Sequence, residues 1–180
     1  MAKYSLTLKR VVFNIILIIL FTTPALAAEK SDWQFYCFGV NLEWVQTAKW
    51  EQVAAGAVAS VLTHTAGHYL AAGITGSRIH QDGFREHCTV DSGGDARWIA
   101  RAGFIAQNGI GLILTSIPKT RHTDFTRGYV AMSAAETWTY PLVWHDDGDL
   151  DMIDKYGGNG DLEWGIYSAV AAHNMLRLKW

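Results

Sequence analysis

The sequence predicts an all-α protein, a small helical bundle that is embedded in a membrane and preceded by a signal peptide. Two observations lead to this fold class. Four long stretches carry no charged side chain or only one, and charged segments separate them. Only three prolines, Pro24, Pro118 and Pro141, interrupt the chain, so that long helices can form. We therefore expect a single helical domain, residues 28–180, after the signal.

The first segment, Met1–Ala27, has the features of a signal peptide. It begins with three cations, continues through the apolar run Val11–Phe21 and ends in Ala25-Leu26-Ala27. A basic start, an apolar centre and a small-x-small end are typical of a segment that signal peptidase removes. We predict an exported protein of the cell membrane, the periplasm or the extracellular side of the envelope. An uncleaved first membrane helix is the alternative.

The charge balance changes when this segment is set aside. The whole chain has 15 Lys and Arg residues against 17 Asp and Glu, whereas residues 28–180 have 12 against 17, a net charge of −5. This excess of acidic groups argues against a protein that binds nucleic acid through a basic patch. The hydrophobic content of 49% argues against a disordered chain, and two cysteines are too few for a disulfide scaffold.

The uncharged stretches predict four helices after the signal. The first is 22 residues long, close to the roughly 20 residues that cross a bilayer, and its small residues suit close helix packing there. Tryptophans lie at the ends of all four stretches, as in the aromatic belt of membrane proteins. A buried helix of a soluble exported protein is the alternative for the first stretch. The predicted helices are Gln52–Gly73, Ala102–Pro118, Gly128–Trp144 and Trp164–Leu176.

Two cysteines provide a test of this topology. Cys37 precedes the first predicted helix and Cys88 follows it. If that helix crosses the membrane, the two thiols lie on opposite sides and cannot pair. If the exported protein is soluble, both thiols share an oxidising compartment and a disulfide is expected.

A histidine pair, His64 and His68, lies inside the first predicted helix. Positions four residues apart share one face of a helix, so both imidazoles can reach one metal ion. A hydrolytic zinc site uses three protein ligands and one open position for water. The pair therefore needs a third ligand from elsewhere in the chain. Two polar residues packed at a helix interface are the alternative.

Residues His64–Ala72, with the sequence HTAGHYLAA, resemble the metal-binding helix of site-2 protease-like intramembrane metallopeptidases. That family carries His-Glu-x-x-His on this helix, and a later Asp-Gly supplies the third ligand. The resemblance implies a zinc site that hydrolyses a peptide bond of a peptide or protein substrate near the membrane. Here Asp147 directly precedes Gly148 and corresponds to the third ligand, with Asp146 and His145 as fallback ligands.

The sequence departs from the family pattern at Thr65, which stands where the catalytic glutamate is expected. A threonine hydroxyl cannot act as a general base near neutral pH. Glu136, the lone acid in the third uncharged stretch, is the candidate for a substitute base. A hydrogen-bonded helix residue without a catalytic role is its alternative. The chain is either an inactive relative, or it draws a base from elsewhere, or the resemblance is accidental.

The acidic segment Asp146–Glu163 suggests calcium as an alternative cofactor. Asp147, Asp149 and Asp151 occupy the first, third and fifth positions of an EF-hand loop. Met152 replaces the required glycine, and the twelfth position lacks its bidentate glutamate, so only a looser calcium site is compatible with the sequence. The corresponding function is a non-enzymatic envelope protein, a structural or binding module with an acidic loop. We favour a metal-binding membrane protein that resembles a zinc metallopeptidase. Whether it retains proteolytic activity depends on whether another residue supplies the missing base.

Overall fold

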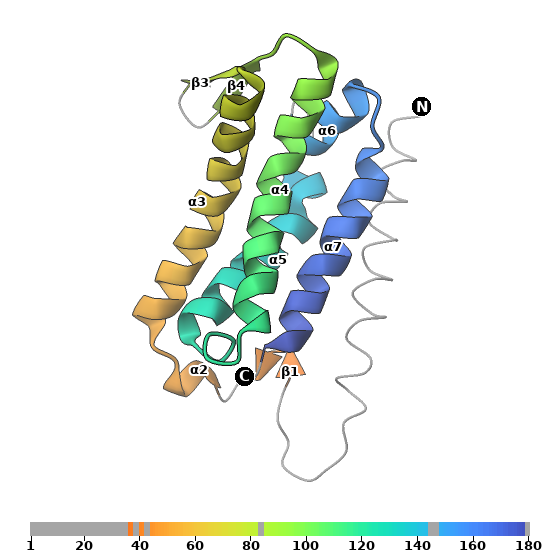
Figure 1. The fold of residues 1–180 in the computed structure, drawn as a ribbon. Coiled ribbons are helices and arrows are strands. Elements are labelled where there is room, and N and C mark those ends of the chain that lie inside the picture. The colour runs from red at the N-terminus through yellow and green to blue at the C-terminus, as the bar shows by residue number, and fades with distance from the viewer. Residues whose placement is uncertain (1–35, 38–39, 42–43, 83–84, 144–147, 179–180) are drawn as a thin grey trace.

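The structure is a computed structural model, and it describes residues 36–37, 40–41, 44–82, 85–143 and 148–178. Its main body consists of long helices that lie side by side (Figure 1). Each of them contains nearly all of one predicted stretch and begins before it, so the all-α prediction and the positions of these helices are confirmed. The helices are α3 (Trp50–Thr75), α4 (Gly93–Ser116), α5 (Asp124–Val143) and α7 (Gly160–Arg177), accompanied by the short helices α2 (Trp44–Thr47) and α6 (Asp149–Lys155).

Two small antiparallel strand pairs complete the described fold. Strands β1 (Tyr36–Cys37) and β2 (Val40–Asn41) form one pair. Strands β3 (Arg78–Asp82) and β4 (Arg85–Thr89) form a hairpin between α3 and α4, with Ile79 opposite Cys88. The charged segment between the first two predicted helices, residues 74–101, thus holds the hairpin and the first turns of α4.

Local sequence signals fix the helix ends. At the start of α4 the Ser92 side chain accepts a hydrogen bond from the Asp95 backbone, and at the start of α7 Asn159 does the same for Leu162. Such caps satisfy backbone N–H groups that have no partner within the helix. Helix α3 ends at Gly76, whose positive φ of 73° favours glycine.

Pro141 lies inside α5 and removes one hydrogen bond of the helix, because proline has no backbone N–H. The carbonyl that would accept this bond belongs to Thr137, four residues earlier. In the structure the indole Nε1 of the buried Trp164 donates to this carbonyl at 2.8 Å. The proline therefore leaves an acceptor on α5 that anchors the start of α7.

Glycines allow α3 to pack closely against its neighbours. A Cβ atom on Gly56 of α3 would collide with the backbone of Phe125 in α5, and one on Gly128 of α5 would collide with the backbone of Val53 in α3. A Cβ atom on Gly67 would collide with the backbone of Ala102 in α4. Close helix contact through small residues is thus the rule along α3.

The core is divided among the helices. Near α6, a cluster joins α4, α5, α6 and α7, while a second cluster joins α5 and α7 at the opposite end of the bundle. Arg101 of α4 and Glu163 of α7 also connect two helices, with Arg101 Nε donating to both carboxylate oxygens at 2.9 and 2.8 Å. The first cluster contains Ala100, Phe104, Tyr140, Leu150, Ile153, Trp164 and Tyr167.

The membrane prediction receives no support from the helices. Among the described residues, none of the helices combines enough length and apolar character to cross a bilayer, and this includes α3, which contains Gln52–Gly73. Polar residues such as Ser60, His64 and His68 interrupt its apolar sequence. Cys88 is a half-buried free cysteine, and the side chain of Cys37 and the predicted signal segment lie outside the described part of the structure.

Candidate metal centre

His64 and His68 lie on the inner face of α3, one helical turn apart. Both are buried, with 7% of each residue exposed. Their rings meet edge to face with centroids 4.8 Å apart, and Phe104 of α4 packs edge to face against His64 at 5.0 Å. The helical spacing seen in the sequence therefore places both imidazoles in one buried site, as predicted.

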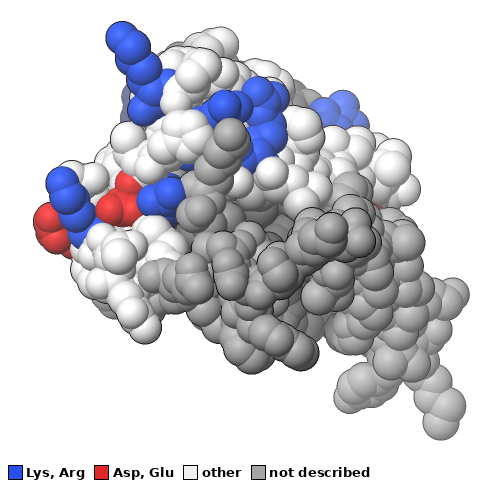
Figure 2. Space-filling model, turned by 90° about the horizontal axis from the view of Figure 1, so that it is seen from below, with Lys and Arg blue, Asp and Glu red and all other residues white. Residues whose placement is uncertain are grey.

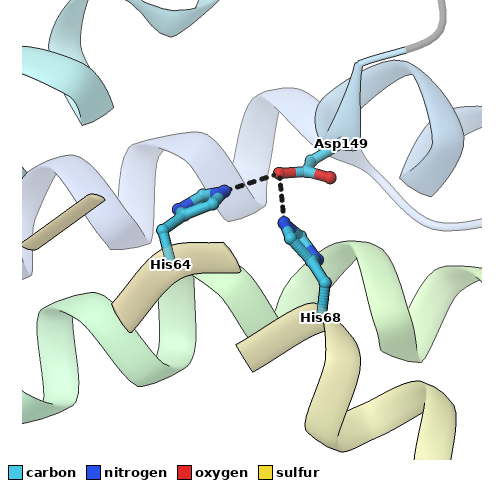
Figure 3. Close-up of side chains that lie close together, drawn as sticks. All are labelled: His64, His68 and Asp149. Carbon is cyan, nitrogen blue, oxygen red and sulfur yellow. Dashed lines mark hydrogen bonds and ion pairs between the residues drawn. The ribbon is translucent and has the colours of Figure 1, made fainter. Parts of the chain in front are cut away.

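Asp149, the first residue of α6, lies opposite both histidines (Figure 3). Its Oδ2 atom is 3.1 Å from Nε2 of His64 and 3.4 Å from Nε2 of His68. One ligand atom from each of the three residues lies within 4.8 Å of the others. Helices α3 and α6 thus bring two nitrogens and one oxygen to a common point.

The other ring nitrogen of each histidine already has a partner. Nδ1 of His68 is 2.7 Å from the backbone carbonyl of Ile99 in α4, and Nδ1 of His64 is 3.3 Å from Oε1 of Gln107. A carbonyl oxygen only accepts hydrogen bonds, so Nδ1 of His68 carries a proton. Gln107 is oriented by its Nε2 atom, which donates to Glu136 Oε2 at 2.7 Å, and its Oε1 therefore accepts from His64.

This hydrogen bonding has a direct electrostatic consequence for the two Nε2 atoms. In a neutral imidazole whose Nδ1 is protonated, Nε2 carries a lone pair. Both lone pairs would then face the Asp149 carboxylate, which itself has only acceptor atoms. Such a convergence is stable only with positive charge between the three residues, supplied either by additional protons on the imidazoles or by a metal ion.

Gly103 of α4 lets both imidazoles pack directly against the α4 backbone. A Cβ atom on Gly103 would lie 2.5 Å from Nε2 of His68 and 2.7 Å from Nε2 of His64. Any side chain there would occupy the space beside both nitrogens. The absence of a Cβ therefore allows both Nε2 atoms to lie close to α4.

Glu136 of α5 lies on the opposite edge of the His64 ring. Its Oε1 is 4.0 Å from Nδ1 of His64, and its Oε2 accepts the hydrogen bond from Gln107. Gln107 is fully buried and also donates to Oγ of Ser60 at 2.9 Å. This chain of contacts orients His64, but it places the Glu136 carboxylate away from the Nε2 side.

Tyr140 of α5 supports Asp149 from its other side. The backbone N–H of Asp149 donates to the Tyr140 hydroxyl at 2.9 Å. Burial and the nearby charge of Asp149 raise the pKa of Tyr140 far above its usual value, so the hydroxyl stays protonated. Burial alone would raise the pKa of Asp149, but when protons supply the positive charge, the charge of His68 and hydrogen bonds with both imidazoles hold it well below its usual range.

The structure assigns the third position of the cluster to an acid that we had not chosen as a zinc ligand. Asp147, Asp146 and His145 all lie outside the described residues. Asp149 follows Asp147 by two residues, and we had considered it only for a calcium loop. Of the residues considered for a calcium loop, 149–155 form α6, and Asp151 on this helix is exposed, whereas Asp147 lies outside the described residues.

Sequence reasoning missed the groups that surround the ligands. Gln107 and Asn108 are two adjacent amides in an otherwise apolar stretch, and this pattern was a signal for buried polar contacts. No comparable signal marked Gly103 or Tyr140, because their roles depend on how α4 and α5 pack against α3 and α6.

Comparisons with known proteins provide no relative for this chain. No protein-family model matches the sequence, and neither the search of curated proteins nor that of solved structures found a match.

Proposed function

We propose that the protein binds one divalent metal ion, most simply zinc, through His64, His68 and Asp149. The observation that carries this proposal is that Nδ1 of each histidine faces an acceptor oxygen while both Nε2 atoms face one carboxylate oxygen. With a proton on each Nδ1, the two Nε2 lone pairs are left to bind an ion. Two imidazole nitrogens and one carboxylate oxygen form a common zinc ligand set. Histidine ligands that donate from their second nitrogen to a carbonyl are typical of metal sites.

The distances and charges of the cluster are compatible with a zinc ion. Bonds of 2.0–2.1 Å in tetrahedral geometry put neighbouring ligand atoms about 3.4 Å apart, and the two distances to Asp149 are 3.1 and 3.4 Å. The carboxylates of Asp149 and Glu136 together carry two negative charges in a largely buried region. A divalent cation balances both charges without protonation of either histidine.

The resemblance to site-2 protease-like metallopeptidases extends this proposal to hydrolysis of a peptide or protein substrate. A divalent ion with an open position polarises a carbonyl and lowers the pKa of bound water. Asp149 and both histidines would hold the ion, and Gly103 would lie beside the two Nε2 atoms that bind it. We propose that Glu136 positions His64 through Gln107, because its carboxylate lies on the wrong edge of the ring to act as a base at the ion.

Localisation completes the proposal. We infer that Met1–Ala27 directs export and that the metal centre acts at a membrane of the cell envelope, with peptide-bond hydrolysis as its reaction if a base is supplied. N-terminal sequencing of protein recovered from the envelope tests the first part, and a mature chain that begins at Ala28 is expected.

The metal content of the purified full chain tests the central proposal. We expect about one zinc ion per chain by mass spectrometric metal analysis, as for a mononuclear site. The double variant His64→Ala, His68→Ala and the single variant Asp149→Asn should lose the ion. His173→Ala and Asp151→Asn replace exposed residues of the same types and should retain it.

Two further measurements make a negative result decisive. Circular dichroism shows whether each variant keeps its helices, so that loss of zinc can be separated from unfolding. Nitrogen NMR of the imidazoles reports their protonation. Folded wild-type protein that takes up no zinc and has both histidines doubly protonated near neutral pH would show that protons, not a metal, supply the positive charge.

A further inference from the structure

The bundle buries a set of polar side chains beside its apolar core and exposes many apolar ones. Many side chains in its interior are polar, whereas buried positions are ordinarily apolar. At the same time, seventeen large apolar residues of the described segments are exposed. The buried polar residues are Ser60, His64, His68, Gln107, Asn108, Thr115, Thr126, Ser133, Thr137, Ser168 and Asn174.

The exposed apolar residues are concentrated on α3 and α4. On α3, Val58, Leu62 and Leu70 are separated by multiples of four residues and share one face, with exposures of 59%, 62% and 68%. On α4, Ile105 and Ile113 are exposed, lie eight residues apart and share one face. The two helices are direct neighbours, because Gly67 packs against the backbone of Ala102. We call these exposed side chains the α3–α4 face.

Charged residues are missing along the length of this face. Helix α3 has none after Glu51, and α4 has none after Arg101. At a rise of 1.5 Å per residue, the uncharged parts of α3 and α4 are about 36 and 22 Å long. Exposed apolar surface of this extent, without interspersed charge, marks an interaction site and is rare on a free soluble protein.

Charges reappear at the ends of the helices. Figure 2 shows Lys and Arg side chains gathered at the end of the bundle where α3 begins and where α4 and α7 end. Acidic groups there include Glu51 and Asp124, and the latter is paired with Arg127. A basic end beside an apolar face complements a bilayer with anionic headgroups. The basic residues at this end include Lys49, Lys119, Arg121, Arg127 and Arg177.

We propose that the α3–α4 face contacts the acyl chains of a lipid bilayer. Lipid suits this face better than a second copy of the chain, because protein interfaces surround an apolar centre with a polar rim. Along α3 and α4 the charges lie at the helix ends and not between the exposed apolar side chains. Contact with acyl chains requires an apolar helix face, which is a different property from the hydropathy needed to cross the membrane. The proposal is independent of the metal centre.

Spin labels on the full chain test this contact. Cys37→Ser and Cys88→Ser provide a background for labelling Leu62→Cys, Ile113→Cys or the control Asp91→Cys, which is exposed before α4. The protein is reconstituted in vesicles of equimolar phosphatidylcholine and phosphatidylglycerol. Labels at positions 62 and 113 should collide more with oxygen, which dissolves in lipid, and several-fold less with a water-soluble nickel complex than the label at position 91.

The unmodified chain provides a second measurement that depends on no variant. A phosphatidylcholine with a photoreactive acyl chain should crosslink to residues 54–74 and 105–117, and not to 149–163. Labels at positions 62 and 113 that are as accessible to nickel as the label at 91 would overturn the proposal. So would spin–spin broadening between copies at these two positions, since it would identify a second chain as the occupant.

Discussion

The two histidines differ in how firmly their orientation is determined. His68 donates to the carbonyl of Ile99, a backbone group that no side-chain substitution removes. His64 instead depends on Gln107, which is held in turn by Ser60 and Glu136. The orientation of His64 can therefore be changed by mutation without touching a ligand.

We expect Gln107→Ala to weaken zinc binding about 10- to 100-fold, the usual effect of removing a hydrogen-bond partner of a metal ligand. The reason is that Nδ1 of His64 loses its acceptor, so the ring is no longer held with Nε2 toward Asp149. Competition titration with a zinc chelator measures the affinity. Nitrogen NMR should show the His64 tautomers becoming mixed, whereas His68 keeps a protonated Nδ1.

The conservative variant Glu136→Gln serves as the comparison. A glutamine at this position can still accept from Gln107, so the tautomer of His64 should be preserved and zinc binding should fall less than in Gln107→Ala. If both variants bound zinc as tightly as the wild type, the proposal that Gln107 and Glu136 position His64 would be wrong.

Asp124, at the start of α5, ties three segments together. It accepts from Nε1 of Trp44 in α2 at 2.6 Å, from the backbone of Lys49 at 2.9 Å and from Arg127 at 2.7 Å. Burial opposes ionisation of Asp124, but these three donors outweigh it and hold the pKa of this carboxyl below its usual value.

A pH-dependent contribution to stability follows from this lowered pKa. The contribution is present above the unfolded pKa of about 3.9 and is lost as the pH falls through the lower folded pKa. We expect Asp124→Asn to reduce the free energy of unfolding by about 1 kcal/mol at pH 7, with a smaller difference below about pH 4. Urea unfolding at several pH values measures it. The exposed control Asp91→Asn should change stability by less than about 0.5 kcal/mol at pH 7.

At the scale of elements, the metal centre depends on the close approach of α3 and α4. Gly67 and Gly103 form this contact, and a Cβ on Gly103 would reach both Nε2 atoms. Gly109 also lies on α4, and no atom lies within 4 Å of the position that a Cβ on Gly109 would take. The two glycines of α4 therefore form a matched pair for mutation.

We expect Gly103→Ala to abolish stoichiometric zinc binding, because the new methyl group displaces both imidazoles. Gly109→Ala should retain zinc and stabilise the helix by up to about 1 kcal/mol, since alanine is the better helix former. Metal analysis and thermal unfolding of both variants provide the comparison. Full zinc binding by Gly103→Ala would mean that the ion does not lie beside Gly103.

The sequence predicts the long helices of this fold but not its hairpin. The four long helices were predictable because uncharged stretches of suitable length follow one another between polar connections. The β3–β4 hairpin was not, because its strands are short and lie in a charged segment that resembles a loop. Likewise, the helical spacing of His64 and His68 predicted their shared site, but the choice among neighbouring acids depends on where α6 begins. Only the packing of α6 brings Asp149 to the histidines.

For the whole molecule, metal binding and folding should be coupled. An ion that binds only the folded chain adds stability of about 2.7 kcal/mol when its free concentration is 100 times the dissociation constant. We expect zinc to raise the Tm of the wild-type protein and a chelator to reverse the change. Asp149→Asn should show no shift with zinc. An equal shift in this variant would indicate that zinc binds elsewhere.

The ligands of the proposed centre also come from distant parts of the chain. His64 and His68 lie near the middle of α3, whereas Asp149 follows α4 and α5 along the sequence. During synthesis the two histidines leave the ribosome well before the acid that completes their cluster. Until α6 has docked, the early part of the chain therefore presents an incomplete pair of ligands. Loading of the ion should report the last stage of assembly of the bundle, and a chain truncated before residue 149 should not retain zinc with the affinity of the full protein.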